Sequence, residues 1–163
     1  MTKIKGIIIF VLRLIALAAT VISTIVMGTA HDSASVLNFK FEAKFTNSPS
    51  FKYYVIIYAI VSCYSLAVLL LPSKSLLWRF ILVLDMVMTL LMTSSLSASM
   101  AVAYIGKKGN SHAGWFPICG QVPKFCDQTT GALAAGFVAA IIYLVLLFYS
   151  LHAALSPLFP VNT

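Results

Sequence analysis

Residues 6–27 read GIIIFVLRLIALAATVISTIVM, a run in which Arg13 is the only charged side chain. A helix needs about 20 mainly apolar residues to cross the hydrocarbon core of a bilayer, so this run is long enough to span it. Three further runs meet the same criterion, at residues 53–71, 76–105 and 131–155. The sequence therefore predicts an all-α integral membrane protein: a four-transmembrane-helix bundle forming a single tetraspan domain over residues 1–163.

The composition supports a membrane protein and excludes several other classes. Of the 163 residues, 61% are hydrophobic and 9% are charged, whereas soluble domains have about 45–50% apolar and about 25% charged residues. So few charges could not keep a water-soluble fold dispersed, which excludes an ordinary cytosolic enzyme and a disordered regulator. The net charge of +7 comes mostly from lysines at the membrane margins. We therefore expect contact with the lipid bilayer and no nucleic-acid partner.

Four spans place both termini on one side of the membrane and two long loops, at about residues 28–52 and 106–130, on the other. Basic residues occur on both sides, so the positive-inside rule alone is weakly informative here. Cys119 and Cys126 lie in the second loop with six residues between them, a separation that one disulfide can close. Because disulfides persist in oxidising compartments, the sequence predicts extracellular loops and cytoplasmic termini.

Two charged residues lie within the apolar runs. Arg13 follows Gly6 by seven residues and Asp85 follows Leu76 by nine, so both lie about 10–13 Å deep from the cytoplasmic side. Either charge alone in hydrocarbon costs about 2.5–3.5 kcal/mol on insertion scales. We expect an intramembrane ion pair between them. Two alternatives remain open: Arg13 reaches the headgroups through its long stem, or Asp85 forms a proton or cation site.

The first outer loop contains apolar residues that alternate with polar ones. Phe39, Phe41 and Phe45 fall on one face of this pattern, which runs over residues 37–45. A period of two is typical of a strand with one buried face, so we expect a short β-strand here. The phenylalanines need a partner surface, and two interpretations remain open. They pack on the second outer loop of the same chain, or they dock on a neighbouring protein.

The second outer loop reads GKKGNSHAGWFPICGQVPKFCDQTT and contains several turn-forming residues. We expect Trp115, Phe116 and Phe125 to anchor this loop, and we count His112, Trp115 and Phe116 among the candidate interaction residues. His112 has no carboxylate or second histidine close by in the sequence. We therefore expect no catalytic site, no metal site and no cofactor. Asp127 closely precedes the fourth apolar run, where it is expected to cap the helix.

Small residues recur every four positions in the outer halves of two spans. They are Ser95, Ser99 and Ala103 in the third span, and Ala132, Gly136 and Ala140 in the fourth. Small residues at this spacing allow helix backbones to approach closely. The two stripes are expected to pack on each other within the bundle, and self-association through one stripe is the alternative.

Several stretches of the chain resemble plant CASP-like proteins, relatives of the Casparian strip membrane domain proteins that are distantly similar to MARVEL proteins. These stretches are LRLIALAAT, AKFTNSPSFKYYVI and GKKGNSHAGWFPICGQVPKFC. The resemblance implies a plasma-membrane protein that forms homo-oligomers, or hetero-oligomers with related members. Strip-forming members build immobile scaffolds that position lignin-polymerising machinery. Residues 37–51 lack the first-loop signature of those members, so the resemblance does not extend to a role in the strip itself.

Two functions from different classes fit the sequence. The first is a non-enzymatic scaffold that self-associates and recruits cell-wall-modifying, extracellular or membrane proteins through its outer loops. Aromatic loops and a membrane interior almost without polar groups favour it. The second is a small ion- or proton-coupled channel or transporter that uses Asp85. An integral-membrane enzyme is not expected, because no His, carboxylate or nucleophile cluster occurs at a common depth.

Overall fold

The computed structural model describes residues 2–36, 39–70 and 77–155 of the chain. Four helices in this part are long and apolar enough to cross a membrane, which confirms the predicted fold class. They are α1 (Thr2–Gly28), α2 (Pro49–Leu70), α3 (Leu77–Lys108) and α4 (Pro123–Leu155).

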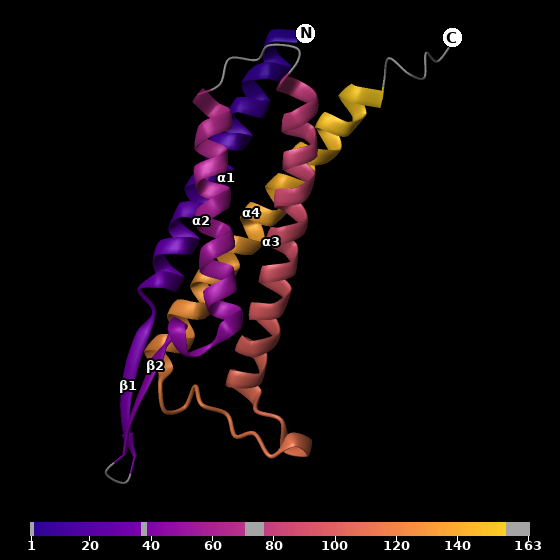
Figure 1. Ribbon diagram of the computed structural model, residues 1–163. Coiled ribbons are helices and arrows are strands. Elements are labelled where there is room, and N and C mark those ends of the chain that lie inside the picture. The colour runs from indigo at the N-terminus through magenta and orange to yellow at the C-terminus, as the bar shows by residue number, and fades with distance from the viewer. Residues whose placement is uncertain (1, 37–38, 71–76, 156–163) are drawn as a thin grey trace.

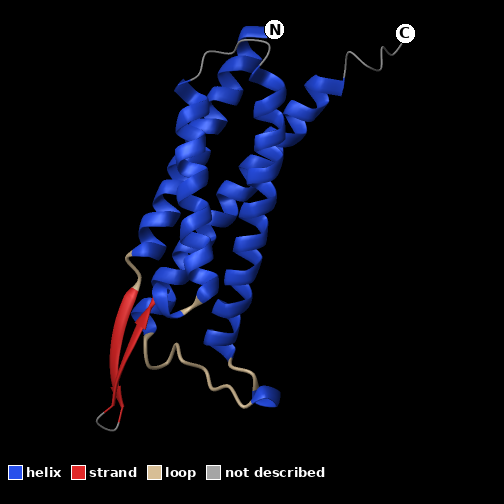
Figure 2. Cartoon of the chain, viewed as in Figure 1, coloured by secondary structure: helices blue, strands red, loops and turns tan. Residues whose placement is uncertain are grey.

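Successive helices run in opposite directions along one bundle (Figure 1). The start of α1 and the end of α4 lie at one end of the bundle, and both long connections lie at the other, as Figure 2 also shows. Helix α4 crosses the bundle obliquely and packs on both α1 and α3. The two loops predicted to share one side of the membrane therefore do lie at one end of the molecule.

The helices extend beyond the apolar runs at the loop end of the bundle. Helix α4 begins at Pro123, and proline suits a first helical position because the backbone N–H there has no partner within the helix. Its 33 residues reach about 50 Å, well beyond a hydrocarbon core of about 30 Å. Asp127 consequently lies inside the helix, and the expectation that it caps the helix is wrong. Buried Phe125 holds this extra turn against the bundle.

The first loop forms a β-hairpin, which confirms the expected strand and adds a second one. Strand β2 (Phe39–Lys44) pairs antiparallel with β1 (His31–Val36), with Val36 opposite Phe39 and His31 opposite Lys44. Phe45 follows the strand and begins a short 3-10 turn, η1 (Phe45–Asn47). Phe39 and Phe41 lie on β2, but their side chains are outside the part that the structure describes.

The interior of the bundle contains many hydroxyl groups, so the expectation of a nearly apolar interior is wrong. Tyrosine, serine and threonine side chains are buried beside the hydrophobic core: Thr20, Ser23, Tyr54, Tyr58, Ser65, Thr89, Ser95, Ser99, Thr129, Tyr143 and Ser150. Many of these hydroxyls donate to helix carbonyl oxygens, as Thr89 Oγ1 does to Asp85 O at 2.6 Å. Such bonds satisfy the polar groups locally. Counting charged residues therefore underestimates how polar the interior is.

Candidate functional site

Arg13 of α1 and Asp85 of α3 are brought together inside the bundle. Arg13 Nη2 donates to Asp85 Oδ2 at 2.6 Å, and Nη1 lies 3.4 Å from Oδ1. The two side chains are only 8% and 1% exposed. A guanidinium that faces both carboxylate oxygens in this way makes a charge-assisted, bidentate contact. The pair therefore links α1 to α3 where water is largely excluded.

Tyr64 of α2 completes this polar site. Its hydroxyl donates to Asp85 Oδ1 at 2.7 Å and also lies 3.2 Å from the carbonyl oxygen of Ile81. Three helices thus meet at one carboxylate, and its negative charge faces hydrogen-bond donors on two sides. Sequence reasoning missed Tyr64 because it compared only charged residues. Its position, six residues before the end of α2 at Leu70, would have placed it near the depth of Asp85.

A second group of hydroxyls joins α1 and α2 to the backbone of α4. Ser23 Oγ and Tyr54 Oη lie 2.6 Å apart, and both contact the carbonyl oxygen of Ala132, at 2.9 and 3.0 Å respectively. Tyr58 donates to the Gly136 carbonyl oxygen at 3.0 Å. The Tyr54 and Tyr58 rings are stacked with centroids 4.1 Å apart. Farther from the loop end of the bundle, Ser65 of α2 and Tyr143 of α4 share a further hydrogen bond.

These tyrosines change the interpretation of the small-residue stripes. Gly136 faces Tyr54 and Tyr58 of α2, and Ser99 Oγ donates to the Ser50 carbonyl oxygen, also in α2, at 3.0 Å. These two residues therefore contact α2, and the packing of the two stripes on each other stays a prediction. The remaining members of the stripes, Ser95, Ala103, Ala132 and Ala140, are buried or half-buried. Gly136 makes room for Tyr54 and Tyr58, because a side chain at this position would overlap the tyrosines.

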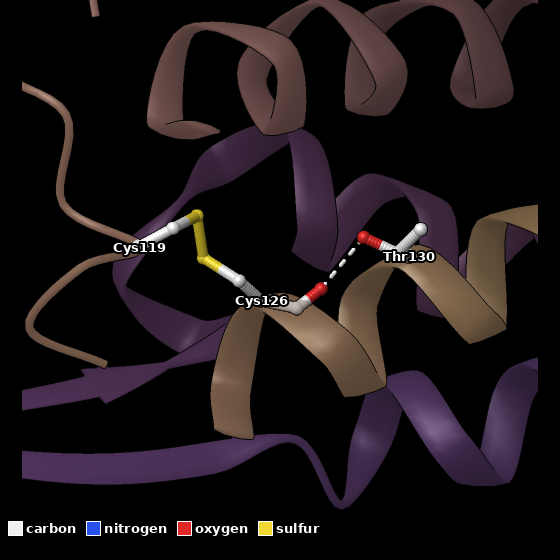
Figure 3. The surroundings of a disulfide bond; sticks show 3 residues. All are labelled: Cys119, Cys126 and Thr130. Atoms are coloured by element: carbon white, nitrogen blue, oxygen red, sulfur yellow. Dashed lines mark hydrogen bonds between the residues drawn. A yellow bond between two sulfur atoms is a disulfide. The ribbon is translucent and has the colours of Figure 1, made fainter. Parts of the chain in front are cut away.

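The second outer loop is fastened to the bundle at its end. Cys119 and Cys126 form a disulfide, with their Cα atoms 5.6 Å apart. Figure 3 shows this bond beside Thr130, whose hydroxyl donates to the carbonyl oxygen of Cys126 at 2.7 Å. Phe125 packs edge-on against Phe51 of α2, with ring centroids 6.0 Å apart. The disulfide and this aromatic pair fix the loop to the start of α4.

The aromatic residues of this loop do not all behave as expected. Phe125 anchors the loop, whereas Trp115 and Phe116 are 57% and 86% exposed, and His112 is exposed beside them. A backbone bridge between Asn110 and Trp115 holds the loop tip in a defined shape. Phe45 from the first loop is instead half-buried against the hydrophobic core. Trp115 and Phe116 therefore form an aromatic tip at the loop end of the bundle.

Removing the disulfide should loosen this tip. We expect Cys119→Ser with Cys126→Ser to lower the free energy of unfolding by about 2 kcal/mol, because the open chain gains freedom when unfolded. Thermal unfolding in detergent, with and without reductant, measures the effect, and limited proteolysis reports on residues 109–122. Cys63→Ala is the matched control, since Cys63 is a free and exposed thiol in α2. Equal proteolysis rates for the wild type and the double variant would contradict the prediction.

Comparison with known proteins identifies the chain. The model of the Casparian strip membrane protein domain matches residues 3–142. The chain belongs to this family. It is 61% identical over 152 residues to a CASP-like protein 1C2 of Ricinus communis, covering 93% of each chain. It is 61% identical over 147 residues to a CASP-like protein 1C1 of Arabidopsis thaliana, covering 90% of each.

A CASP-like protein 1C3 of Populus trichocarpa is 58% identical over 162 residues, which cover 99% of both chains. No solved structure matches the chain. The resemblance to plant CASP-like proteins is thus confirmed over nearly the whole sequence. The Casparian strip membrane protein domain family consists of multi-pass membrane proteins and is not an enzyme family.

Proposed function

We propose that this CASP-like protein is a non-enzymatic plasma-membrane scaffold. It self-associates into a membrane platform and recruits cell-wall-modifying or other proteins through its outer loops. The aromatic tip carries this proposal: Trp115 and Phe116 are exposed on a loop that the disulfide ties to α4. Exposed aromatic residues in a preformed loop are typical of binding surfaces, because little entropy is lost when a partner docks.

The proposed orientation has the hairpin and the aromatic tip outside the cell and both termini in the cytoplasm. The disulfide supports this orientation, because cytoplasmic thiols are kept reduced. The arrangement of both loops at one end of the bundle (Figure 1) gives a partner access to them together. The outer faces of the helices are apolar, with exposed side chains such as Phe10, Ile22 and Phe148. These faces suit contact with lipid or with another copy of the chain.

The contacts of Asp85 favour the scaffold over a channel or transporter. A carboxylate that carries protons or cations has to be exposed to them in part of its cycle. Asp85 is 1% exposed and is contacted by Arg13 and Tyr64. These contacts suit a structural link between helices.

Self-association is tested by counting subunits in single fluorescent complexes at the plasma membrane, together with recovery after photobleaching. We expect several copies per complex and slow recovery. Trp115→Ser with Phe116→Ser should leave folding and copy number unchanged and speed up recovery severalfold, because partners are released. Lys124→Ser, at an exposed position in the first turn of α4, is the control. Single copies in the wild type, or recovery unaffected by the loop variant, would contradict the proposal.

A further inference from the structure

Three adjoining hollows lie at the loop end of the bundle. One of about 310 Å³ is bounded by the hairpin and the start of α2, and one of about 390 Å³ lies between α3 and α4. A small hollow of about 50 Å³ adjoins both, since it shares Phe51 with the first and Lys107 with the second. We call the larger of the two the α3–α4 groove. Its apolar walls are formed mainly by Met100, Ala103, Tyr104, Leu133, Ala134 and Phe137.

The α3–α4 groove opens toward the bilayer. Tyr104 is 67% exposed and Phe137 is 51% exposed, although both lie on helices that cross the membrane. From Met100 to Lys107 the groove follows α3 for about 10 Å, given a rise of 1.5 Å per residue. An apolar trough of this length beside the hydrocarbon core matches a segment of an acyl chain.

A cation lies at the outer end of this groove. Lys107 is in the last turn of α3, lines the groove and is exposed. Among the residues that the structure describes, no carboxylate lies within ion-pair distance of it. An ammonium group above an apolar trough at the membrane surface matches a lipid phosphate above its chains.

A buried hydroxyl provides an independent indication of a ligand. Thr129 is 2% exposed and lines the small hollow together with Lys107. Its Oγ1 has no hydrogen-bond partner within the described part of the chain. A buried hydroxyl without a partner is costly, so most are satisfied by protein, water or ligand. An oxygen atom of a molecule held at Lys107 would satisfy it.

We infer that the α3–α4 groove binds one phosphate-bearing lipid from the leaflet at the loop end. Its acyl chain lies between Ala103 and Ala134, its phosphate contacts Lys107, and a phosphate or ester oxygen accepts a hydrogen bond from Thr129. The apolar walls favour a lipid over free phosphate. The lipid site does not depend on self-association, and binding in detergent tests it separately from the scaffold.

Native mass spectrometry of the full chain in detergent tests the phosphate contact. Phosphatidylglycerol, phosphatidylcholine and diacylglycerol with identical chains are titrated. We expect one lipid per chain, with both phospholipids binding about tenfold more tightly than diacylglycerol. Lys107→Gln should remove that difference, and the matched control Lys108→Gln should keep it, because Lys108 does not line the groove. Equal binding of diacylglycerol, or an unchanged preference in Lys107→Gln, would overturn the inference.

Two further variants test the groove and the hydroxyl. Ala134→Phe should fill the groove and abolish the one-lipid complex, whereas Ala67→Phe, on an exposed part of α2, should not. Thr129→Val should weaken phospholipid binding severalfold without lowering stability, because it removes an unpaired hydroxyl. Unchanged lipid binding in Ala134→Phe or in Thr129→Val counts against the site. Loss of dimers in Ala134→Phe, with lipid binding intact, would show an interface between copies instead.

Photo-crosslinking of the wild type removes any dependence on variants that fold poorly. Phosphatidylcholine with a diazirine on its acyl chain is incorporated and the crosslinked peptides are sequenced. We expect labelling concentrated at residues 100–104 and 133–137 and suppressed by excess unlabelled phosphatidylcholine. Labelling spread evenly over all four helices would overturn the inference.

Discussion

Replacing Asp85 by asparagine is expected to lower the free energy of unfolding by about 3–5 kcal/mol. The substitution keeps the size of the side chain and removes its charge, so the buried Arg13 guanidinium loses its counter-ion. Tyr64 also loses the ionised acceptor that its hydroxyl contacts. Unfolding in bicelles, followed by a helix-sensitive signal, measures the loss.

Two double variants separate loss of the pair from loss of packing. Arg13→Leu with Asp85→Leu removes both charges and is expected to fall within about 1–2 kcal/mol of the wild type, because no charge is left unpaired. Tyr64 retains the Ile81 carbonyl oxygen as an acceptor in this variant. Arg13→Asp with Asp85→Arg should recover part of the stability that each single exchange loses. If neither double variant is more stable than the single variants, the two charges are not coupled.

Gly136→Ala is the second substitution with a large expected effect, a loss of roughly 3 kcal/mol. A Cβ atom at Gly136 would overlap the Tyr54 hydroxyl and would lie 3.0 Å from Tyr54 Cζ and from Tyr58 Cε1. Overpacking of a core costs about 1–3 kcal/mol, and displaced tyrosines lose hydrogen bonds worth about 1 kcal/mol each. The same unfolding assay measures the result.

Gly131 provides the matched control on the same helix. A Cβ there meets nothing within 4 Å, so Gly131→Ala should be neutral or should stabilise the helix by up to about 1 kcal/mol. Tyr54→Phe should lessen the damage of Gly136→Ala, because it removes the hydroxyl that the new methyl group meets. Equal effects of alanine at Gly131 and at Gly136 would show that helix propensity, not close packing, governs both positions.

Much of the fold and part of the site could be predicted from the sequence. A run of apolar residues can be recognised from consecutive residues of the chain, so hydropathy predicted the four spans. The depth of a residue in the membrane likewise follows from its distance in sequence from the start of its apolar run. Comparing these depths predicted that Arg13 and Asp85 can meet. The two cysteines lie close enough in sequence for their spacing to indicate the disulfide.

The parts that could not be predicted depend on how the helices cross. Nothing in the sequence alone indicates that Tyr54 and Tyr58 point at the backbone of α4, so the contact of Gly136 with α2 was not predicted. Strand β1 has the sequence HDSASV, which lacks the alternation of apolar and polar residues from which strand β2 was predicted. Trp115 and Phe116 differ from Phe125 in burial, although the sequence predicted one loop for all three. Phe125 lies in the first turn of α4 and packs against Phe51, whereas Trp115 and Phe116 precede the helix.

The ion pair also has a consequence for the order of synthesis. Asp85 follows Arg13 by 72 residues, so α1 leaves the ribosome well before its counter-charge exists. At synthesis rates of about 5–20 residues per second, this interval lasts roughly 4–14 seconds. During that time an inserted α1 would carry Arg13 without its counter-charge, at a cost of about 2.5–3.5 kcal/mol on insertion scales. We therefore expect the pairing with α3 to stabilise α1 in the membrane after its insertion, which couples the stability of the first span to assembly of the bundle.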